Sequence, residues 1–202
     1  MKKNIRSQKS APRKSIETQI VAASQTIQQL ILISGQIEEA AGKMTEALRN
    51  GNKIVCFGNG GSAADAQHLA AELLGRFEKE RRSLPALALT TNSSTLTSIA
   101  NDYDYKEVFS RPVCGLVRAG DVVIAISTSG NSPNVLEGIR AAKNIGAYVI
   151  GWTGRSGGKM KDLADLCLCV PSDRTPRIQE GHEVILHILC GLVEEGLFPS
   201  AR

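Results

Sequence analysis

The chain has 202 residues, of which 42% are hydrophobic and 22% are charged. A chain of this length folds without a disulfide or metal staple, and its composition excludes disordered, collagen-like and disulfide-scaffold proteins. Its formal net charge of +4 suggests a polyanionic partner. However, residues 1–14 contain six positive charges and no acid, so the net charge of residues 15–202 is −2. We therefore expect residues 1–14 to be a disordered basic tail, and we expect neither nucleic acid nor a membrane as a partner.

The cysteines and the apolar runs indicate a cellular compartment. Five cysteines, an odd number, form no Cys-x-x-Cys pair, and most stand among apolar residues. No stretch reaches the roughly 20 apolar residues of a membrane helix, and the basic start lacks the apolar core of a secretory signal. These features favour free structural thiols and the reducing cytoplasm.

Residues 15–50 form a helical extension in our interpretation. Apolar residues recur at helical spacings of three, four and seven, at Ile16, Ile20, Ile27, Leu30 and Ile37. A Gly51-Asn52 turn ends the run. This extension is expected to pack on the rest of the chain or on another subunit, and with residues 51–202 it forms one domain over 15–202.

Short apolar runs alternate with amphipathic segments over the rest of the chain. The predicted strands are 53–58, 84–90, 121–127, 147–153 and 165–170. The predicted helices are 63–77, most of 95–118, 134–146, about 159–164 and 177–195. This alternation is typical of βαβ units in a parallel sheet that is covered by helices on both faces.

Two of the predicted loops suit a phosphate group. Gly58 to Ser62 joins the first strand to a helix, and glycines there let the backbone and the helix start approach an anion. Residues 127–133 (STSGNSP) place four hydroxyls beside another helix start. An ordinary tight turn is the alternative for the first loop, and simple helix capping is the alternative for the second. Neither loop matches the triphosphate motif or a clean dinucleotide motif, so we expect a phosphate monoester and no nucleotide cofactor.

Three strings in order carry a family resemblance: GNGGSAADAQHLAAELLGRF, STSGNSPN and RIQEGH. They resemble the sugar isomerase (SIS) superfamily and, within it, the phosphoheptose isomerases, over about residues 15–198. The resemblance implies a flavodoxin-like three-layer fold with a five-stranded parallel sheet, and a homotetramer with active sites at subunit interfaces. It also implies conversion of sedoheptulose 7-phosphate to D-glycero-D-manno-heptose 7-phosphate, an early step towards bacterial surface heptoses.

An aldose–ketose isomerase needs a base for the sugar proton and an acid or base for the oxygens. His68 and Glu72 stand four residues apart on one predicted helix face, near the first loop. His187 lies in an apolar helix, where a histidine is often only a core residue. Glu72 lies in another helix, and a glutamate on a helix is usually just a solvated charge. The resemblance implies that Glu72 and His187 are the catalytic pair.

The resemblance also implies a zinc ion and a set of substrate contacts. The zinc ligands would be His68, Glu72, Gln179 and His187, although Gln179 and His187 lie roughly 12 Å apart along an ideal helix. Some family members carry an acid just before RIQE, where this chain has Thr175-Pro176. The implied substrate contacts are Asn59, Gly60, Gly61, Ser62, Asn101, Asp102, Ser127, Thr128, Ser129, Ser132 and Gln179.

A different class of function remains as an alternative. Non-catalytic adaptors of the same superfamily, such as the DnaA initiator-associating protein, share the sheet and the loops but lack an acid at the position of Glu72. A third possibility is a regulatory domain that senses a sugar phosphate. The sequence shows no DNA-binding motif, which argues against it. The presence of both Glu72 and His187 favours the enzyme.

Overall fold

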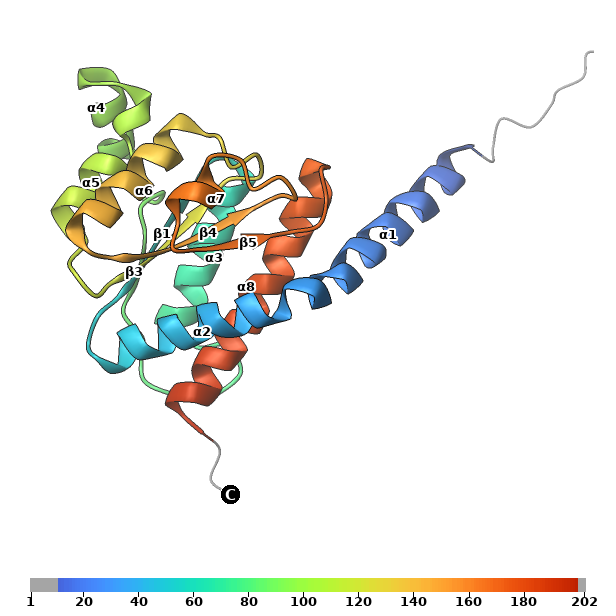
Figure 1. The fold of residues 1–202 in the computed structure, drawn as a ribbon, viewed down its shortest axis with the longest axis horizontal. Coiled ribbons are helices and arrows are strands. Elements are labelled where there is room, and N and C mark those ends of the chain that lie inside the picture. The colour runs from blue at the N-terminus through green and yellow to red at the C-terminus, as the bar shows by residue number, and fades with distance from the viewer. Residues whose placement is uncertain (1–10, 200–202) are drawn as a thin grey trace, which may run out of the picture.

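The computed structural model describes residues 11–199, and only the backbone of residues 11–14. The N-terminal segment consists of α1 (Ala11–Gln29), the short 3-10 helix η1 (Leu30–Ile33) and α2 (Ser34–Arg49). The predicted helical extension is therefore confirmed, with a break at the four apolar residues of η1. Helix α1 begins inside the expected tail of residues 1–14, and residues 1–10 lie outside the described part. In Figure 1, α1 projects away from the body of the molecule.

A five-stranded parallel sheet forms the centre of the molecule. Its strands are β1 (Ile54–Gly58), β2 (Ala86–Ala88), β3 (Val122–Ile126), β4 (Tyr148–Thr153) and β5 (Leu166–Cys169), in the order β2-β1-β3-β4-β5. Strands β1 and β3 are buried throughout, as expected for the central strands of a sheet with both faces covered. The fold class predicted from the sequence is confirmed.

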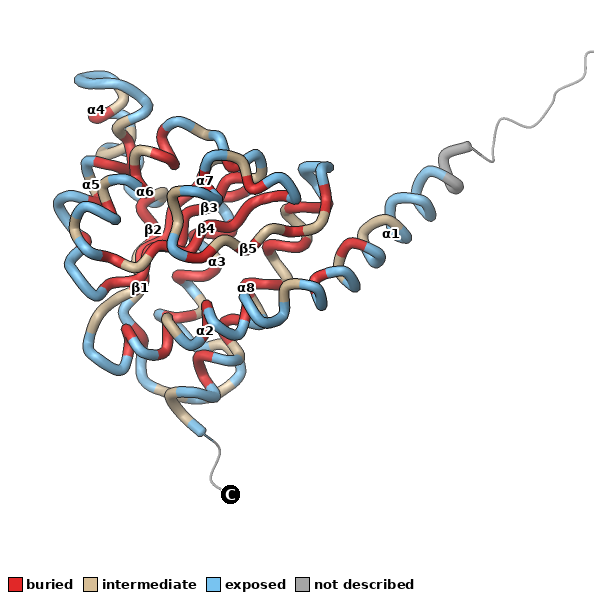
Figure 2. Tube along the Cα trace, viewed as in Figure 1, coloured by how far each residue is buried: buried red, intermediate tan, exposed pale blue. Residues whose placement is uncertain are grey.

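Helices cover both faces of the sheet (Figure 2). Helices α2, α3 (Gly61–Leu74) and α8 (Thr175–Leu197) share a buried hydrophobic cluster with alternate strand residues such as Ile54 and Ile124. The residues between these, such as Val55 and Val123, pack on the opposite side. The elements on that side are α4 (Ser93–Asp102), η2 (Tyr105–Glu107), α5 (Ser110–Leu116), α6 (Pro133–Ile145) and α7 (Met160–Leu163). Among the described helices, none is both long and apolar enough to span a membrane.

The strand order reverses between β1 and β3, which are neighbours at the centre of the sheet. In open parallel sheets, the crevice beyond the carboxyl ends of the strands at such a switch point is where ligands bind. The two loops predicted to hold a phosphate follow β1 and β3. The topology therefore places both of them at the switch point, which the sequence alone does not reveal.

Helices α3 and α8 run side by side in the same direction. Four contacts show this: Gly61 meets Gln179, His68 meets Glu183, and Phe77 meets first His187 and then the Glu194 carboxylate. The residue numbers rise together along both helices. Residues far apart in the sequence thus face one another across this pair of helices, starting at the first loop.

Candidate active site

The first loop, residues 58–62, is held in a shape that only glycines permit. Gly60 has φ +55° immediately before the first turn of α3. A Cβ on Gly58 would lie 2.7 Å from the Ser62 Cβ, and a Cβ on Gly61 would collide with the Gln179 amide. Within this turn, the N–H groups of Ser62, Ala63 and Ala64 donate to the carbonyls of Asn59 and Gly60, so an anion at the start of α3 would meet the backbone of the two glycines. Gly60 and Gly61 are exposed, whereas Ser62 is buried.

The second loop, residues 127–133, gathers its hydroxyls around Ser127. Ser127 Oγ lies 3.0 Å from Ser132 Oγ and 3.5 Å from Ser129 Oγ. Ser132 is the N-cap residue of α6, but its side chain makes no capping hydrogen bond. Simple helix capping therefore does not explain this hydroxyl. Gly130, with φ +65°, packs against the backbone of Gly157, which fixes the shape of the loop.

An amide pair joins the two loops. Asn59 Nδ2 donates to Asn134 Oδ1 at 2.9 Å, and Asn134 Nδ2 donates back to Asn59 Oδ1 at 2.8 Å. Tyr105 Oη also donates to Asn59 Oδ1, at 3.2 Å. Asn134 is almost completely buried at the start of α6. Sequence reasoning missed Asn134, because nothing in a helix start indicates a partner 75 residues away.

A cluster of two histidines and two glutamates lies between α3 and α8. His68 Nε2 is 3.1 Å from Glu72 Oε1, and His68 Nδ1 is 2.8 Å from Glu183 Oε1. The ring centroids of His68 and His187 are 5.2 Å apart in an edge-to-face arrangement. The predicted residues His68, Glu72 and His187 are thus brought to one region. We call these three residues, together with Glu183, the histidine cluster.

Helical spacing supplies the signal that could have found Glu183. Glu183 and His187 are four residues apart on α8, just as His68 and Glu72 are four residues apart on α3. Sequence reasoning took only His187 from this pair. The third histidine, His182, is fully buried against Trp152, and its Nε2 lies 3.3 Å from the Thr153 carbonyl. It faces away from the cluster, as its helical offset from His187 predicts.

Gln179 lies apart from the cluster along the helix pair. Its amide is in contact with Gly61 at the start of α3. Seven residues separate Gly61 from His68, which is about 10 Å along a helix. Gln179 therefore belongs with the first loop in this structure, and its place among the metal ligands stays a prediction.

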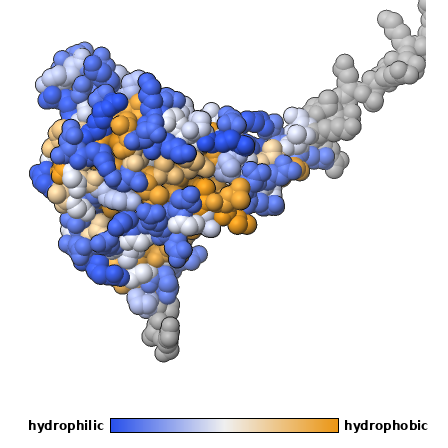
Figure 3. Space-filling view, in the orientation of Figure 1, coloured by the Kyte–Doolittle hydropathy of each residue, from blue (hydrophilic) through white to orange (hydrophobic). Residues whose placement is uncertain are grey.

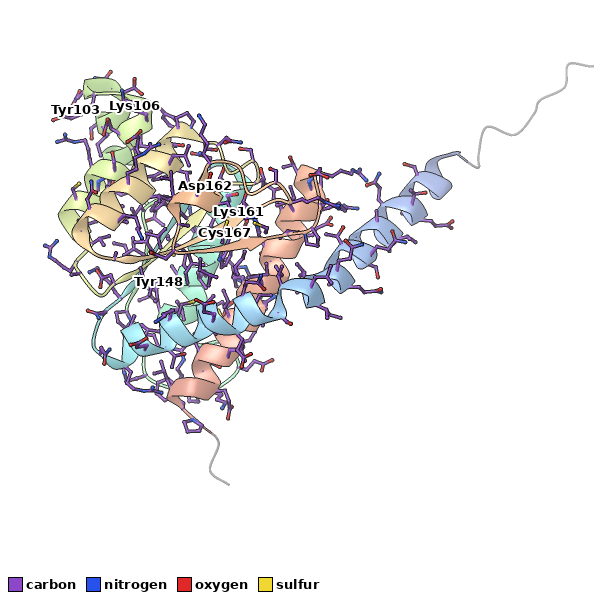
Figure 4. The ribbon with its side chains drawn as sticks, viewed as in Figure 1. Tyr103, Lys106, Tyr148, Lys161, Asp162 and Cys167 are labelled. Atoms are coloured by element: carbon purple, nitrogen blue, oxygen red, sulfur yellow. The ribbon has the colours of Figure 1, made fainter. Side chains whose placement is uncertain are left out.

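Asn101 and Asp102 lie at the end of α4 and are exposed. Their side chains bond to each other: Asn101 Nδ2 donates to Asp102 Oδ1 at 2.9 Å. Figure 4 places the next residue, Tyr103, at the tip formed by α4, well away from α8. Within one chain, the structure does not bring this pair to the histidine cluster, and its contact with a sugar stays a prediction.

The donor set of the cluster suits a metal ion such as zinc. Ligand atoms of His68, Glu183 and His187 all lie within 4.8 Å of one another, and imidazole and carboxylate are ordinary zinc ligands. The nearby carboxylate of Asp65 adds negative charge that a cation would offset. Burial and the charge of Glu183 raise the pKa of Asp65 to about 6, while His68 opposes this rise. Among residues 11–199, nothing hydrogen-bonds to the buried Asp65 Oδ2. The residues present therefore fit a divalent cation.

Comparison with known proteins agrees with this geometry. A family model described as the SIS domain matches residues 19–154. The phosphoheptose isomerase of Rhodospirillum rubrum is 59% identical over 161 residues, which cover 80% of this chain and 86% of that protein. The chain belongs to the phosphoheptose isomerase family. Two solved structures of this family share its fold. The phosphoheptose isomerase of Neisseria gonorrhoeae is 42% identical, with a TM-score of 0.87 over 92% of this chain and 100% of that one. The enzyme of Francisella tularensis is 35% identical, with a TM-score of 0.89 over 92% of this chain and 99% of that one.

Membership of the phosphoheptose isomerase family accounts for the two loops and the histidine cluster together. An isomerase of a sugar phosphate needs a phosphate site and a proton-transfer site at a fixed separation. The first loop, at the start of α3, and the histidine cluster, between α3 and α8, provide two such places. The three relatives from Rhodospirillum, Neisseria and Francisella are all phosphoheptose isomerases, and none of these three is an adaptor.

Proposed function

We propose that this protein isomerises sedoheptulose 7-phosphate to D-glycero-D-manno-heptose 7-phosphate, in the cytoplasm. The observation that carries the proposal is the joint position of the loops and the histidine cluster on α3 in a chain of this family. The phosphate lies between the first loop and the hydroxyls around Ser127, and the reacting carbons reach Glu72. Gln179, at the first loop, contacts the sugar between them.

The reaction moves one proton between two carbons. Glu72 takes a proton from C1 of the ketose, which gives an enediol, and returns it to C2. His187 moves a proton between the oxygens on C2 and C1. His187 is 43% exposed at its side chain, so substrate can reach it, unlike the buried His182. Glu72 is also partly exposed, so both acid–base groups can meet a bound sugar.

We further propose that the cluster holds one zinc ion per chain. His68, Glu72 and His187 would hold it, with Gln179 as a fourth ligand if its side chain swings from the first loop. When bound, zinc would polarise the two oxygens on C1 and C2. The support for this is that ligand atoms of His68 and His187 lie close together, that Glu72 Oε1 lies 3.1 Å from His68 Nε2, and that the nearby Asp65 Oδ2 has no hydrogen-bond partner among the described residues.

The active form that we propose is a homotetramer with its sites at subunit interfaces. Helix α8 carries both the histidine cluster and the wall of an apolar groove, since Val184 and Ile188 follow Glu183 and His187 directly. A second chain that covers this groove also approaches the cluster. The exposed pair Asn101-Asp102, on a separate tip of the molecule, is then available to the site of a neighbouring chain.

The test is an assay of the purified chain with sedoheptulose 7-phosphate, with the product identified by NMR. We expect an aldoheptose 7-phosphate. Glu72→Gln and His187→Gln should each fold and assemble as the wild type does, yet lose turnover by at least about 100-fold, because general acid–base catalysis contributes that much. A matched control, Glu137→Gln, changes a similarly exposed carboxylate on α6 and should keep full activity.

Two outcomes would count against the proposal. Full activity in either variant would remove that residue from the proton transfer. No conversion by the wild type, combined with binding to a replication initiator, would favour the adaptor instead.

A further inference from the structure

The side chain of Glu183 is the part of the histidine cluster that the proposed chemistry leaves unexplained. It comes from α8, whereas His68, whose imidazole it approaches, comes from α3. Its Oε1 lies 2.8 Å from His68 Nδ1 and 4.0 Å from His187 Nε2. No motif of the family resemblance includes this position. Its side chain is 41% exposed, so core packing does not account for it.

His68 stands between two carboxylates on opposite edges of its ring. Nε2 faces Glu72 at 3.1 Å, and Nδ1 faces Glu183 at 2.8 Å. The two ring nitrogens point in different directions, so one metal ion can be bound by only one of them. One carboxylate can therefore share an ion with His68, and the other must act on the far nitrogen.

The proposed ligand set, together with the distances, indicates which carboxylate has which role. Two ligand atoms that are each about 2.1 Å from one tetrahedral zinc ion lie roughly 3.4 Å apart. The 2.8 Å separation of Glu183 and Nδ1 is shorter than this and suits an N–H···O hydrogen bond. The Glu72 separation of 3.1 Å also suits a hydrogen bond to Nε2, so it is the proposed ligand set, which contains Glu72, that places the ion on the Nε2 side.

We propose that Glu183 is a positioning residue for His68. Its carboxylate accepts a hydrogen bond from Nδ1–H and so holds the ring with Nε2 directed at Glu72. A carboxylate that accepts the second N–H of a histidine fixes its tautomer and orientation and strengthens it as a ligand. The inference rests on the proposed function for its consequence in catalysis, but the contact itself does not depend on that function.

The histidine side chains allow a direct test, because the chain has only three of them. Two-bond nitrogen–proton NMR spectra of protein labelled with nitrogen-15 in histidine, metal-free and zinc-loaded, report which ring nitrogen carries a proton. We expect a proton on His68 Nδ1 in both forms of the wild type, and partial or complete transfer to Nε2 in metal-free Glu183→Ala. His182→Gln and His187→Gln assign the signals.

Zinc affinity and kinetics provide the second readout. Loss of a carboxylate behind a metal-binding histidine weakens metal binding about 10- to 100-fold. We expect a zinc affinity lower by this factor in Glu183→Ala, a smaller loss in Glu183→Gln, which retains an acceptor oxygen, and no change in Glu137→Ala. In turnover we expect a lower kcat with KM changed less than about twofold, because the phosphate loops are untouched.

Several results would overturn the proposal. One is a bare Nδ1 in the wild type, and another is an Nδ1 proton that Glu183→Ala leaves fully in place. A loss of zinc affinity greater than about 1000-fold would instead make Glu183 a direct ligand. Failure of the proposed function looks different, since the wild type would then show the His68 proton pattern without converting sedoheptulose 7-phosphate.

Discussion

His182 shows how burial of one ionisable side chain makes stability depend on pH. It is fully buried beside Trp152, and its Nδ1 has no hydrogen-bond partner in the described part of the chain. Burial lowers the pKa of His182 to about 4, although the hydrogen bond with the Thr153 carbonyl partly opposes this. The unfolded chain binds a proton near pH 6.5 and the native chain only near pH 4, so acid favours unfolding within that window.

We predict that His182→Gln makes the protein less sensitive to mild acid. Between pH 7 and pH 5, protonation of the unfolded form costs the native state about 2 kcal/mol through this residue. Urea unfolding at the two pH values measures the loss in each protein. The wild type should lose about 2 kcal/mol more than the variant, whatever the variant costs at pH 7. An equal loss in both proteins would show that His182 does not contribute.

Single residues of the candidate site were predictable where their signal is local. The spacing of His68 and Glu72 and the hydroxyls of residues 127–132 are visible in the sequence. The structure brings the first pair together and gathers the hydroxyls of Ser127, Ser129 and Ser132. Glu183 has the same spacing to His187, but its role depends on a partner on another helix. Without the neighbouring helix, an exposed glutamate looks like any solvated charge.

At the scale of elements, the order of strands and helices was predictable and their neighbours in space were not. Strand and helix positions follow from hydrophobic periodicity and glycine-rich ends. The break at η1 was missed, because four consecutive apolar residues continue a helical pattern without a signal for tighter winding. The side-by-side packing of α3 and α8 depends on strand order, and so does the pairing of Asn59 with Asn134.

The end of α3 is fixed by a buried ion pair with α8. Arg81 Nε lies 2.9 Å from Glu194 Oε1, and both side chains are 1% exposed. Arg81 also donates to the carbonyl of Glu72 at 2.8 Å. Burial raises the pKa of Glu194, but the N–H groups of Lys79, Phe77 and Glu78 together with Arg81 bring it below its usual value. This pair therefore anchors the helix that carries the proposed base.

We predict that Glu194→Ala lowers the free energy of unfolding by about 3–5 kcal/mol, because it leaves Arg81 charged, buried and unpaired. The neighbouring Glu195→Ala removes an exposed pair with Lys79 and should cost less than about 1 kcal/mol. Chemical denaturation measures both. Replacing both partners, as Arg81→Met with Glu194→Leu, should recover part of the loss. A double variant less stable than Glu194→Ala would show that the charge is not the cause.

At the scale of the whole molecule, an apolar groove of about 430 Å³ lies where the N-terminal helices meet α8. It is lined by residues including Ile27, Ile31, Ile37, Val184, Ile188 and Leu192. Figure 3 shows hydrophobic side chains gathered where α1 joins the body. Ile31 is 75% exposed in the single chain, as is its neighbour Leu32. A contiguous apolar surface of this kind marks an interface with another protein, and we assign it to a second copy of the chain.

We predict that Ile31→Asp disrupts the proposed tetramer, because a charge placed in an apolar interface must lose its hydration without a partner. Light scattering coupled to size-exclusion chromatography should show about four chains for the wild type and a smaller assembly for the variant. Leu116→Asp is the matched control, since Leu116 is 46% exposed on α5, on the other face of the sheet. Isomerase activity should fall together with assembly in Ile31→Asp alone, because α8 carries residues of both the groove and the histidine cluster. A fully active single-chain species would contradict both the assignment of the groove and the placing of the site at an interface.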